Sequence, residues 1–401
     1  MVESKSETLA TDLSKYEYVP AICIVGYNRP DSLRRVLSAL ARSFCPAGVQ
    51  LVISIDRALT PDPLNEEVFT IAQEFVWDRG PKEVIWREEN VNLPDHILLC
   101  ADMTEQYGSV LIIEDDLFLA PDFYRYALEA TNFYKDEERV AGIGLYSCIN
   151  NSFAHHLPFY PVPDGSSALF LQIPCSWGQV WTRKQWRAFR TWWNKKTGFS
   201  PSDPIPEQPK HWGAHAWDNH FLKYLTEEGK YFVWPFQAYS TNFMDAGTHF
   251  DGQGNHYQSP LQMGRAPLQF LPLDESHSRY DAYFEIEPAI LNHYLPELAE
   301  YDYVVDLYGI KQLELFESPY VLTQKPVASS IKSFSNKLKP FEMNIMQNIK
   351  GNNIFLVEKS AVIDREAREP GHLFDYYYSH IPIKALLRLL RKRIQKRLAR
   401  K

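Results

Sequence analysis

Three consecutive acidic residues, Glu114, Asp115 and Asp116, directly follow the apolar run from Val110 to Ile113. Such a run, rich in β-branched side chains, is typical of a strand buried on both faces. Carboxylates at the end of a buried strand repel one another and lose hydration, so a positive charge must compensate them. Hard oxygen ligands suit Mg²⁺ or Mn²⁺, and we expect such a cation to bridge these acids to a phosphate. An acidic loop at a helix N-terminus is the alternative, since the helix dipole also favours acids there.

Polar residues also follow the strands predicted at residues 21–25 and 51–55. Asn28 and Arg29 lie in the turn after the first strand, and Asp56 follows the second. In open α/β sheets, ligands bind at the carboxyl ends of the strands. We therefore expect these residues and the three acids at one sheet edge. A surface position in the turn is the other interpretation of Arg29.

Strands and helices alternate through the first 280 residues. This alternation predicts an α/β fold, with a Rossmann-like, mostly parallel sheet covered by helices on both faces. Later strands are expected at residues 140–146, 168–173, 231–234 and 238–242. The chain is predicted to divide into a flexible N-terminus (1–17), a catalytic domain (18–280), a small C-terminal α+β appendage (281–375) and a basic amphipathic helix (376–401).

Three motifs together resemble a known enzyme class. They are Asn28-Arg29-Pro30, the run from Glu114 to Phe123, and Trp217-Asp218. Over about residues 20–250 the chain is similar to GT-A nucleotide-diphospho-sugar glycosyltransferases, in particular to the N-acetylglucosaminyltransferase I group and related bacterial enzymes. The segments 176–186 and 242–249 resemble the bacterial members. The resemblance implies the GT-A fold, Mn²⁺ or Mg²⁺ as cofactor, and a nucleotide-sugar donor such as UDP-GlcNAc.

The resemblance also implies roles for the residues of the acidic motif and the first turn. Asp116 matches the metal-binding residue, and Glu114 and Asp115 match residues that contact the ribose and the donor sugar. Arg29, beside Asn28 in the nucleotide-sugar motif, matches a basic residue near the diphosphate. Its guanidinium can add a bidentate contact there.

Two further acids receive roles in the same way. Asp56 matches the acid that binds the base or ribose of the nucleotide, and Asp218 matches the general base of the inverting enzymes. The chemistry agrees, because a cation at Asp116 would offset the charge that develops on the nucleoside diphosphate leaving group. Asp218, at the start of a predicted helix, could then accept the proton of the acceptor hydroxyl. A helix N-cap is the alternative role for Asp218.

An acceptor pocket is predicted from the tryptophans that crowd residues 177–217. Sugar rings stack their C–H faces on indole, while the ring N–H reaches a hydroxyl. Trp177 with Gly178, and Trp217, are the predicted acceptor residues. His249 is a further candidate metal ligand, because neutral imidazole binds Mn²⁺. Equally, His249 could be a loop histidine whose ring is hydrogen-bonded to a carbonyl group.

Composition and charge give expectations about partners and cellular compartment. The net charge of −8 argues against general nucleic-acid binding, and five scattered cysteines indicate reduced thiols in a cytosolic protein. The polar N-terminus is not expected to be a signal peptide.

Residues 384–401 hold nine Lys or Arg and no acid, so the rest of the chain carries −17, the −8 of the whole less these nine charges. An apolar stripe along this tail predicts a helix in an anionic membrane interface. Binding to nucleic acid or to the acidic body is the alternative.

These expectations combine into one function. The chain is expected to be a metal-dependent, inverting glycosyltransferase that moves a sugar from a UDP-sugar to a glycan or lipid-linked acceptor. It would serve surface polysaccharide or glycoconjugate synthesis, peripherally bound to the inner face of the plasma membrane. Two alternatives stay open. One is a nucleotidyltransferase acting on sugar phosphates, although the loop at residues 26–30 is not the Gly-rich, basic phosphate loop that such an enzyme would have. The other is a non-catalytic sugar-binding or scaffold subunit.

Overall fold

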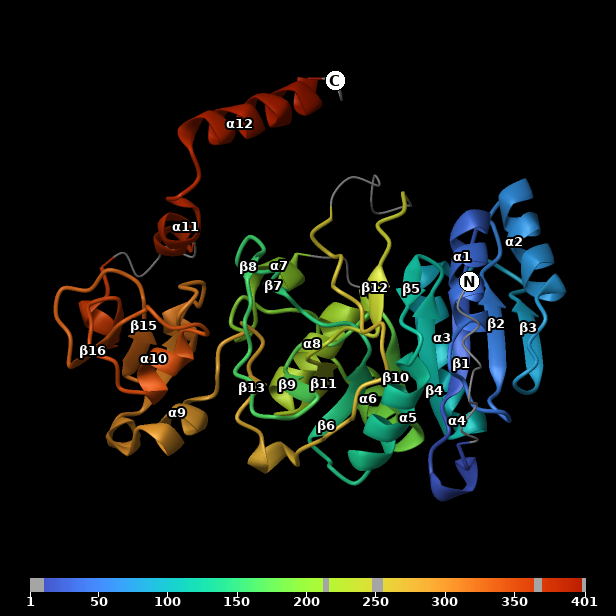
Figure 1. The fold of residues 1–401 in the computed structure, drawn as a ribbon, viewed down its shortest axis with the longest axis horizontal. Coiled ribbons are helices and arrows are strands. Elements are labelled where there is room, and N and C mark those ends of the chain that lie inside the picture. The colour runs from blue at the N-terminus through green and yellow to red at the C-terminus, as the bar shows by residue number, and fades with distance from the viewer. Residues whose placement is uncertain (1–10, 212–215, 247–254, 364–369, 399–401) are drawn as a thin grey trace. The chain divides into compact units, whose positions relative to one another are not determined.

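The computed structural model describes residues 11–211, 216–246, 255–363 and 370–398 (Figure 1). The chain divides into two compact units. Unit 1 comprises Met1–Asn151 and His156–Ile290, and unit 2 comprises Ser152–His155 and Leu291–Lys401.

Unit 1 is built around a nine-stranded sheet with the order β13-β9-β11-β6-β10-β4-β1-β2-β3. Five of its eight strand pairings are parallel, and β10 is antiparallel to both of its neighbours. The predicted α/β class with a mostly parallel sheet is thus confirmed. The strands of this sheet are β1 (Ala21–Gly26), β2 (Leu51–Ile55), β3 (Lys82–Trp86), β4 (Ser109–Glu114), β6 (Val140–Gly144), β9 (Ala168–Leu171), β10 (Gln179–Thr182), β11 (Tyr231–Pro235) and β13 (Arg279–Tyr280).

Helices connect these strands. They are α1 (Pro30–Ala41), α2 (Pro63–Glu74), α3 (Asn92–Asp102), α4 (Thr104–Tyr107), α5 (Phe123–Phe133), α6 (Arg183–Trp193), α7 (Glu207–Lys210) and α8 (Trp217–Glu227). A further helix, α9 (Pro288–Tyr294), follows β13 where unit 1 ends. Local sequence fixes several starts: Pro30 begins α1, and Thr182 with Gln185 forms a capping box at α6.

Two small pairings complete unit 1. β5 (Leu117–Leu119) pairs with β12 (Ser240–Asn242), and β7 (Asn150–Asn151) pairs with β8 (Leu157–Pro158). β5 was not predicted, because three residues carry too little pattern. Its pairing with β12 brings residues 240–242, far later in the chain, beside the acidic motif.

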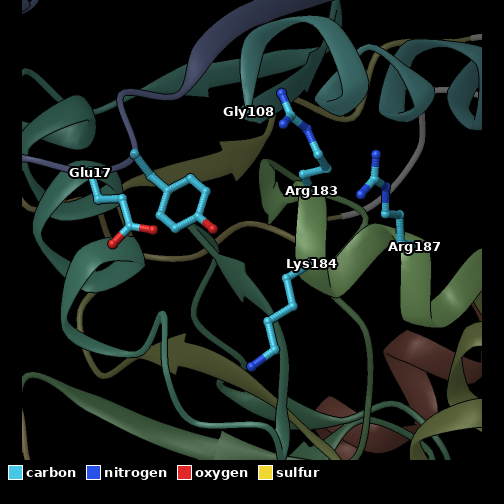
Figure 2. A pocket seen from close by; sticks show the side chains of 6 residues that line it. Glu17, Gly108, Arg183, Lys184 and Arg187 are labelled. Carbon is cyan, nitrogen blue, oxygen red and sulfur yellow. The ribbon is translucent and has the colours of Figure 1, made fainter.

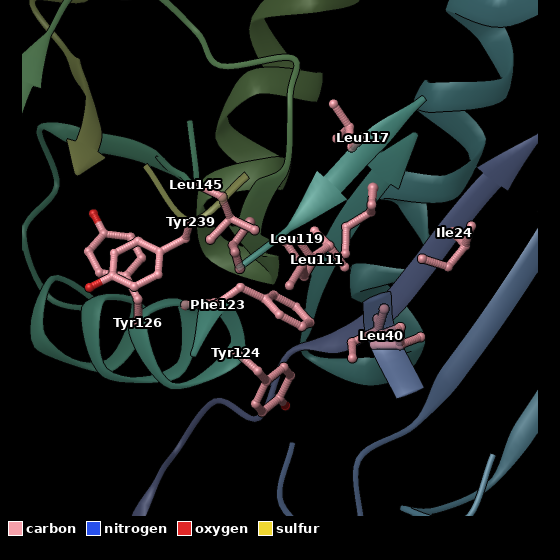
Figure 3. Packing of buried hydrophobic residues seen from close by; sticks show 14 of the residues in the cluster. Ile24, Leu40, Leu111, Leu117, Leu119, Phe123, Tyr124, Tyr126, Leu145 and Tyr239 are labelled. Carbon is pink, nitrogen blue, oxygen red and sulfur yellow. The ribbon is translucent and has the colours of Figure 1, made fainter. Parts of the chain in front are cut away.

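The core of unit 1 lies between the sheet and helices α1 and α5 (Figure 3). Ile24 and Leu111 from neighbouring strands pack with Leu40 of α1, and all three are at most 1% exposed. On the α5 side, the rings of Tyr126 and Tyr239 stack with centroids 4.5 Å apart. Because β4 is buried on both faces in this core, the acids at its end are held on a rigid element.

Unit 2 contains a four-stranded sheet with the order β14-β15-β17-β16. Its strands are β14 (Tyr303–Asp306), β15 (Tyr320–Thr323), β16 (Lys332–Phe334) and β17 (Ile354–Glu358), and its helices are α10 (Glu342–Met346), α11 (Gly371–Tyr378) and α12 (Ile383–Leu398). Short 3₁₀ turns in the chain lie at Leu13–Lys15, Leu273–Glu275, Pro296–Glu300, Leu313–Leu315 and Lys359–Ala361. Among the described residues, no helix combines the length and the apolar character that crossing a bilayer requires.

Candidate active site at the carboxyl edge of the main sheet

The strand register brings the predicted residues to one edge. In the parallel pairs around β1, Val25 lies opposite Glu114 and Gly26 lies opposite Ile55. The turn carrying Asn28 and Arg29, the residue after β2, and the acidic motif therefore leave the sheet side by side. This edge is where open α/β sheets bind ligands.

Arg29 is the internal partner of the acidic motif. Its guanidinium pairs with Asp115, through Nη2 to Oδ1 and through Nε to Oδ2 at 3.3 Å, and its Nη1 donates to Asp116 Oδ2 at 3.0 Å. Burial raises the pKa of Asp115 to about 6, against the opposing charge of Arg29. Part of the compensation that the three acids require thus comes from Arg29, and a contact of Arg29 with a diphosphate stays a prediction.

The second carboxylate oxygen of Asp116, Oδ1, is available to bind a ligand. Oδ1 is buried and has no hydrogen-bond partner among the described residues. Within that part of the chain, no group of three or more His, Cys, Asp or Glu side chains could enclose a metal ion. The residues nevertheless fit Mg²⁺ or Mn²⁺, because Mg²⁺ in particular is often held by one or two carboxylates with substrate phosphates and water.

Glu114 and Asp218 lie within electrostatic range of one another. Burial, followed by the charges of Asp116 and Asp115, raises the pKa of Glu114 well above its usual range, and the charge of Asp218 adds to this rise. Asp218 lies in the first turn of α8, and burial raises its pKa as well. Ala216, not Asp218, is the N-cap of α8. The alternative role for Asp218 as the helix cap is therefore wrong.

Asp56 and Asn28 are engaged within the protein. Asp56 is 4% exposed, and its carboxylate accepts hydrogen bonds from the backbone N–H of Arg57 and of Val91, both at 3.0 Å, and from the side chain of Asn90 at 3.2 Å. Asn28 donates from Nδ2 to Asp62 Oδ2 at 3.0 Å. These contacts hold the loops beside the acidic motif, and direct contacts of either residue with a nucleotide stay predictions.

The three predicted acceptor residues lie in different environments. Trp177 is partly exposed and lies two residues before Gln179, the first residue of β10, which pairs with Ile112 of β4. Gly178 is buried with φ of +89°, and a side chain there would meet Leu145, so it forms the turn behind Trp177. Trp217 is 5% exposed and packs edge-on against Trp181. The Trp217 ring is thus packed in the core, and its role as an acceptor residue stays a prediction.

The candidate His249 lies outside the described residues. Two buried side chains that the sequence did not single out lie near the site instead. Gln179, opposite Ile112, is fully buried with neither amide atom paired, and Asn219 Nδ2, next to Asp218, is also buried and unpaired within the described part of the chain. Buried polar atoms without partners call for an explanation, and a bound ligand is one. No sequence pattern distinguishes them from ordinary polar residues.

A segment from β12 braces the acidic motif. Phe243 N–H donates to Asp116 O at 2.8 Å. Two residues on, the Asp245 carboxylate pairs with Arg35 of α1 and accepts from Ser32 Oγ at 2.7 Å. Arg35 in turn lies 3.7 Å over the ring of Phe243. These contacts fix the backbone of Asp116 to α1.

A separate cavity of about 570 Å³ lies at the other end of β4 (Figure 2). Gly108, just before β4, and residues from the first turns of α6 line it. Its cations are already occupied: Arg187 pairs with Glu105, and Lys184 pairs with Glu138. This cavity is therefore not part of the site around Asp116.

Comparison with protein-family models and with curated proteins found no match. Solved structures give remote similarities, each covering 55% of this chain. One is GalNAc-T7 with UDP, GalNAc and Mn²⁺, at 12% sequence identity and a TM-score of 0.36 over 43% of that chain. Another is S. aureus TarS, at 15% identity and a TM-score of 0.32 over 36% of that chain. A third is the mannosyltransferase PcManGT from Pyrobaculum calidifontis with GDP-Man and Mn²⁺, at 13% identity and a TM-score of 0.33 over 55% of that chain. The chain thus spans about half, or less, of the length of these proteins.

Proposed function

We propose that this protein is a metal-dependent glycosyltransferase that uses a nucleoside diphosphate sugar. The observation that carries the proposal is Asp116 Oδ1, a buried carboxylate oxygen without a partner in the described chain, at the carboxyl end of a parallel strand. A divalent cation bound there would neutralise the charge on the departing diphosphate. Arg29 holds Asp116 from the opposite oxygen and fixes its orientation.

Asp218 supplies the second half of the proposed reaction. A carboxylate at the start of α8, within the electrostatic reach of Glu114, can accept the proton of an acceptor hydroxyl. A raised pKa makes it a stronger base than an exposed aspartate. This arrangement supports attack on the anomeric carbon with inversion. A UDP-sugar such as UDP-GlcNAc as donor, and the grouping with N-acetylglucosaminyltransferase I, stay predictions.

A thermal-stabilisation screen tests the proposal. Ligands that bind only the folded protein raise its melting temperature. We expect one or more of UDP-GlcNAc, UDP-glucose, UDP-galactose and GDP-mannose to stabilise the protein with Mn²⁺ and to lose the effect with EDTA. Stabilisation by a nucleoside triphosphate with a sugar phosphate, and by no nucleotide sugar, would favour the nucleotidyltransferase alternative.

The C-terminal helix supports a second proposal, that the enzyme works on an anionic membrane surface at the inner face of the plasma membrane. The apolar stripe of α12 is 43–75% exposed along its length, and it consists of Ile383, Leu386, Leu387, Leu390, Ile394 and Leu398. Nine basic residues accompany it in the last eighteen. Such a helix lies in the interface and binds anionic lipid. The acceptor is then a glycan or lipid-linked sugar in surface glycoconjugate synthesis.

A further inference from the structure

A continuous group of aromatic rings lies on one side of the acidic motif. The ring of Tyr257 is 4.8 Å from that of Trp177 and 4.1 Å from that of His256. His156 extends the group, with its ring 4.6 Å from His256, and Tyr146 closes the other end at 4.6 Å from Trp177. Tyr146 is buried and the other four rings are partly exposed. We call these five residues the aromatic platform.

The fold ties the platform to the acidic motif. Tyr146 follows β6 and Trp177 precedes β10, and Leu145 N–H donates to Gly178 O at 2.8 Å to hold the two chain segments together. Ser240 Oγ of β12 donates to Trp177 O at 2.5 Å. Because β12 pairs with β5, which begins directly after Asp116, the platform lies one strand away from the proposed metal ligand.

Two loops are held so that they present the platform. Ser259, two residues after Tyr257, donates from its N–H to Thr241 Oγ1 at 2.8 Å and from its Oγ to Ser147 O at 2.9 Å. His156 lies in the turn between β7 and β8, where both His155 and His156 have positive φ, at 52° and 56°. Residues other than glycine seldom adopt this conformation, and it concentrates at functional sites.

The order of the strands separates two sides of the site. Arg29 and Asp56 follow β1 and β2 on one side of β4, whereas Trp177 precedes β10 and Tyr146 follows β6 on the other side. If the nucleotide binds on the β1–β2 side, where the predicted nucleotide-sugar residues Arg29 and Asp56 lie, the platform is left for the second substrate. Its members combine an apolar ring face with a polar tip, which matches the C–H faces and hydroxyls of a sugar ring.

We infer that the aromatic platform is the acceptor subsite and that it binds a pyranose ring by stacking, chiefly on Tyr257 and Trp177. This inference rests on the proposed glycosyl transfer. It goes beyond the prediction for Trp177 in assigning Tyr257, His256 and His156 to acceptor binding. The acceptor is accordingly a glycan with a terminal sugar ring.

Saturation-transfer NMR on the full chain with methyl glycosides of glucose, galactose and N-acetylglucosamine tests the inference. With UDP and Mn²⁺ present, at least one glycoside is expected to receive saturation on its ring C–H protons. Tyr257→Ala should reduce this signal at least fivefold, and Tyr257→Phe, which keeps the ring, should retain most of it. Phe44→Ala, which removes a 54%-exposed ring on the loop after α1, is the matched control and should leave the signal unchanged.

The same samples separate this inference from the proposed function. Mn²⁺-dependent UDP binding, measured by calorimetry, should be equal in wild type and Tyr257→Ala. If UDP binds but no glycoside is saturated, or if Tyr257→Ala leaves the signal intact, the platform is loop packing and the inference fails. If glycosides bind through Tyr257 while UDP does not bind at all, the platform is a sugar site and the proposed transferase function fails.

Discussion

Arg29 Nη1 donates a hydrogen bond to Asp116 Oδ2 at 3.0 Å, on the side of the carboxylate opposite its unpartnered oxygen. The same guanidinium pairs with Asp115, so one cation holds two acids of the motif. A carboxylate fixed in this way presents Oδ1 to a metal ion without rearrangement. Arg29 therefore acts on the proposed metal site through Asp116.

Replacing Arg29 should destabilise the protein. Arg29→Ala leaves Asp115, which is 2% exposed, without its partner. We expect a loss of about 3 kcal/mol in the free energy of unfolding, the lower end for an unpaired buried charge, because a quarter of the Arg29 side chain is exposed. Urea unfolding measures this loss. The double variant Arg29→Ala/Asp115→Ala should lose less than the sum of the single variants, and additive losses would show that the pair is not coupled.

Asp218→Asn should remove the proposed base while keeping its size. Turnover with a donor and acceptor found by screening should fall by roughly 10²–10⁴-fold, the usual contribution of general base catalysis. Metal-dependent UDP affinity should stay within twofold. Glu228→Gln, which neutralises an exposed acid at the other end of α8, is the control. Turnover of Asp218→Asn close to that of the control would place the base elsewhere.

Glu342 in unit 2 predicts a pH dependence of stability. Burial raises its pKa to about 7. The buried carboxyl is tolerated in its neutral form, so its contribution to the free energy of unfolding is fully present below pH 4.5, the usual pKa of the unfolded chain. This contribution is lost as the pH rises through 7 and the buried group must ionise. Glu342→Gln should match wild type at pH 4.5 and exceed it by on the order of 3 kcal/mol at pH 8. Calorimetric unfolding of both proteins checks this, and an equal difference at both pH values would contradict it.

The basic helix should direct the protein to anionic vesicles. Deleting residues 381–401 removes nine positive charges, each contributing about 1 kcal/mol near such a surface, together with the apolar stripe. In flotation with phosphatidylglycerol vesicles, the full chain should bind and be partly released by high salt, and the truncated chain should not bind. UDP binding should survive the deletion.

A second variant separates the two contributions of the helix. Leu386→Ser/Leu390→Ser/Ile394→Ser keeps every charge and removes the middle of the stripe. Its binding should become fully salt-sensitive, because screening weakens charge attraction but not apolar burial. If the truncated chain still floats with anionic vesicles, the tail has another role.

The sheet and its acidic edge could be predicted from the sequence because local patterns determine them. β1, β2 and β4 are short apolar runs, and their polar ends meet at one edge whenever strands are parallel. The antiparallel insertion of β10 could not be read in this way. It depends on the left-handed turn at Gly178, after which β10 runs antiparallel to β4 from Gln179 onward.

Side-chain partners were harder to predict than strands. Arg29 has the same neighbours in sequence whatever its partner, and its pairing with Asp115 is visible only in the folded chain. Trp177 and Trp217 look alike in sequence, yet the second packs on Trp181 because α8 covers the sheet there. The platform residues Tyr257 and His156 are 101 positions apart and meet only through the anchoring of their loops.

Calorimetric titration of UDP into wild type and Asp116→Asn, with Mn²⁺ and with EDTA, tests whether Asp116 holds the metal ion. Asp31→Asn is the control, because Asp31, two residues after Arg29, has a fully exposed side chain. Wild type and the control should bind UDP only with Mn²⁺, and Asp116→Asn should lose at least 100-fold in affinity while melting as a folded protein. Tight, EDTA-sensitive UDP binding by folded Asp116→Asn would contradict the assignment of the metal to Asp116.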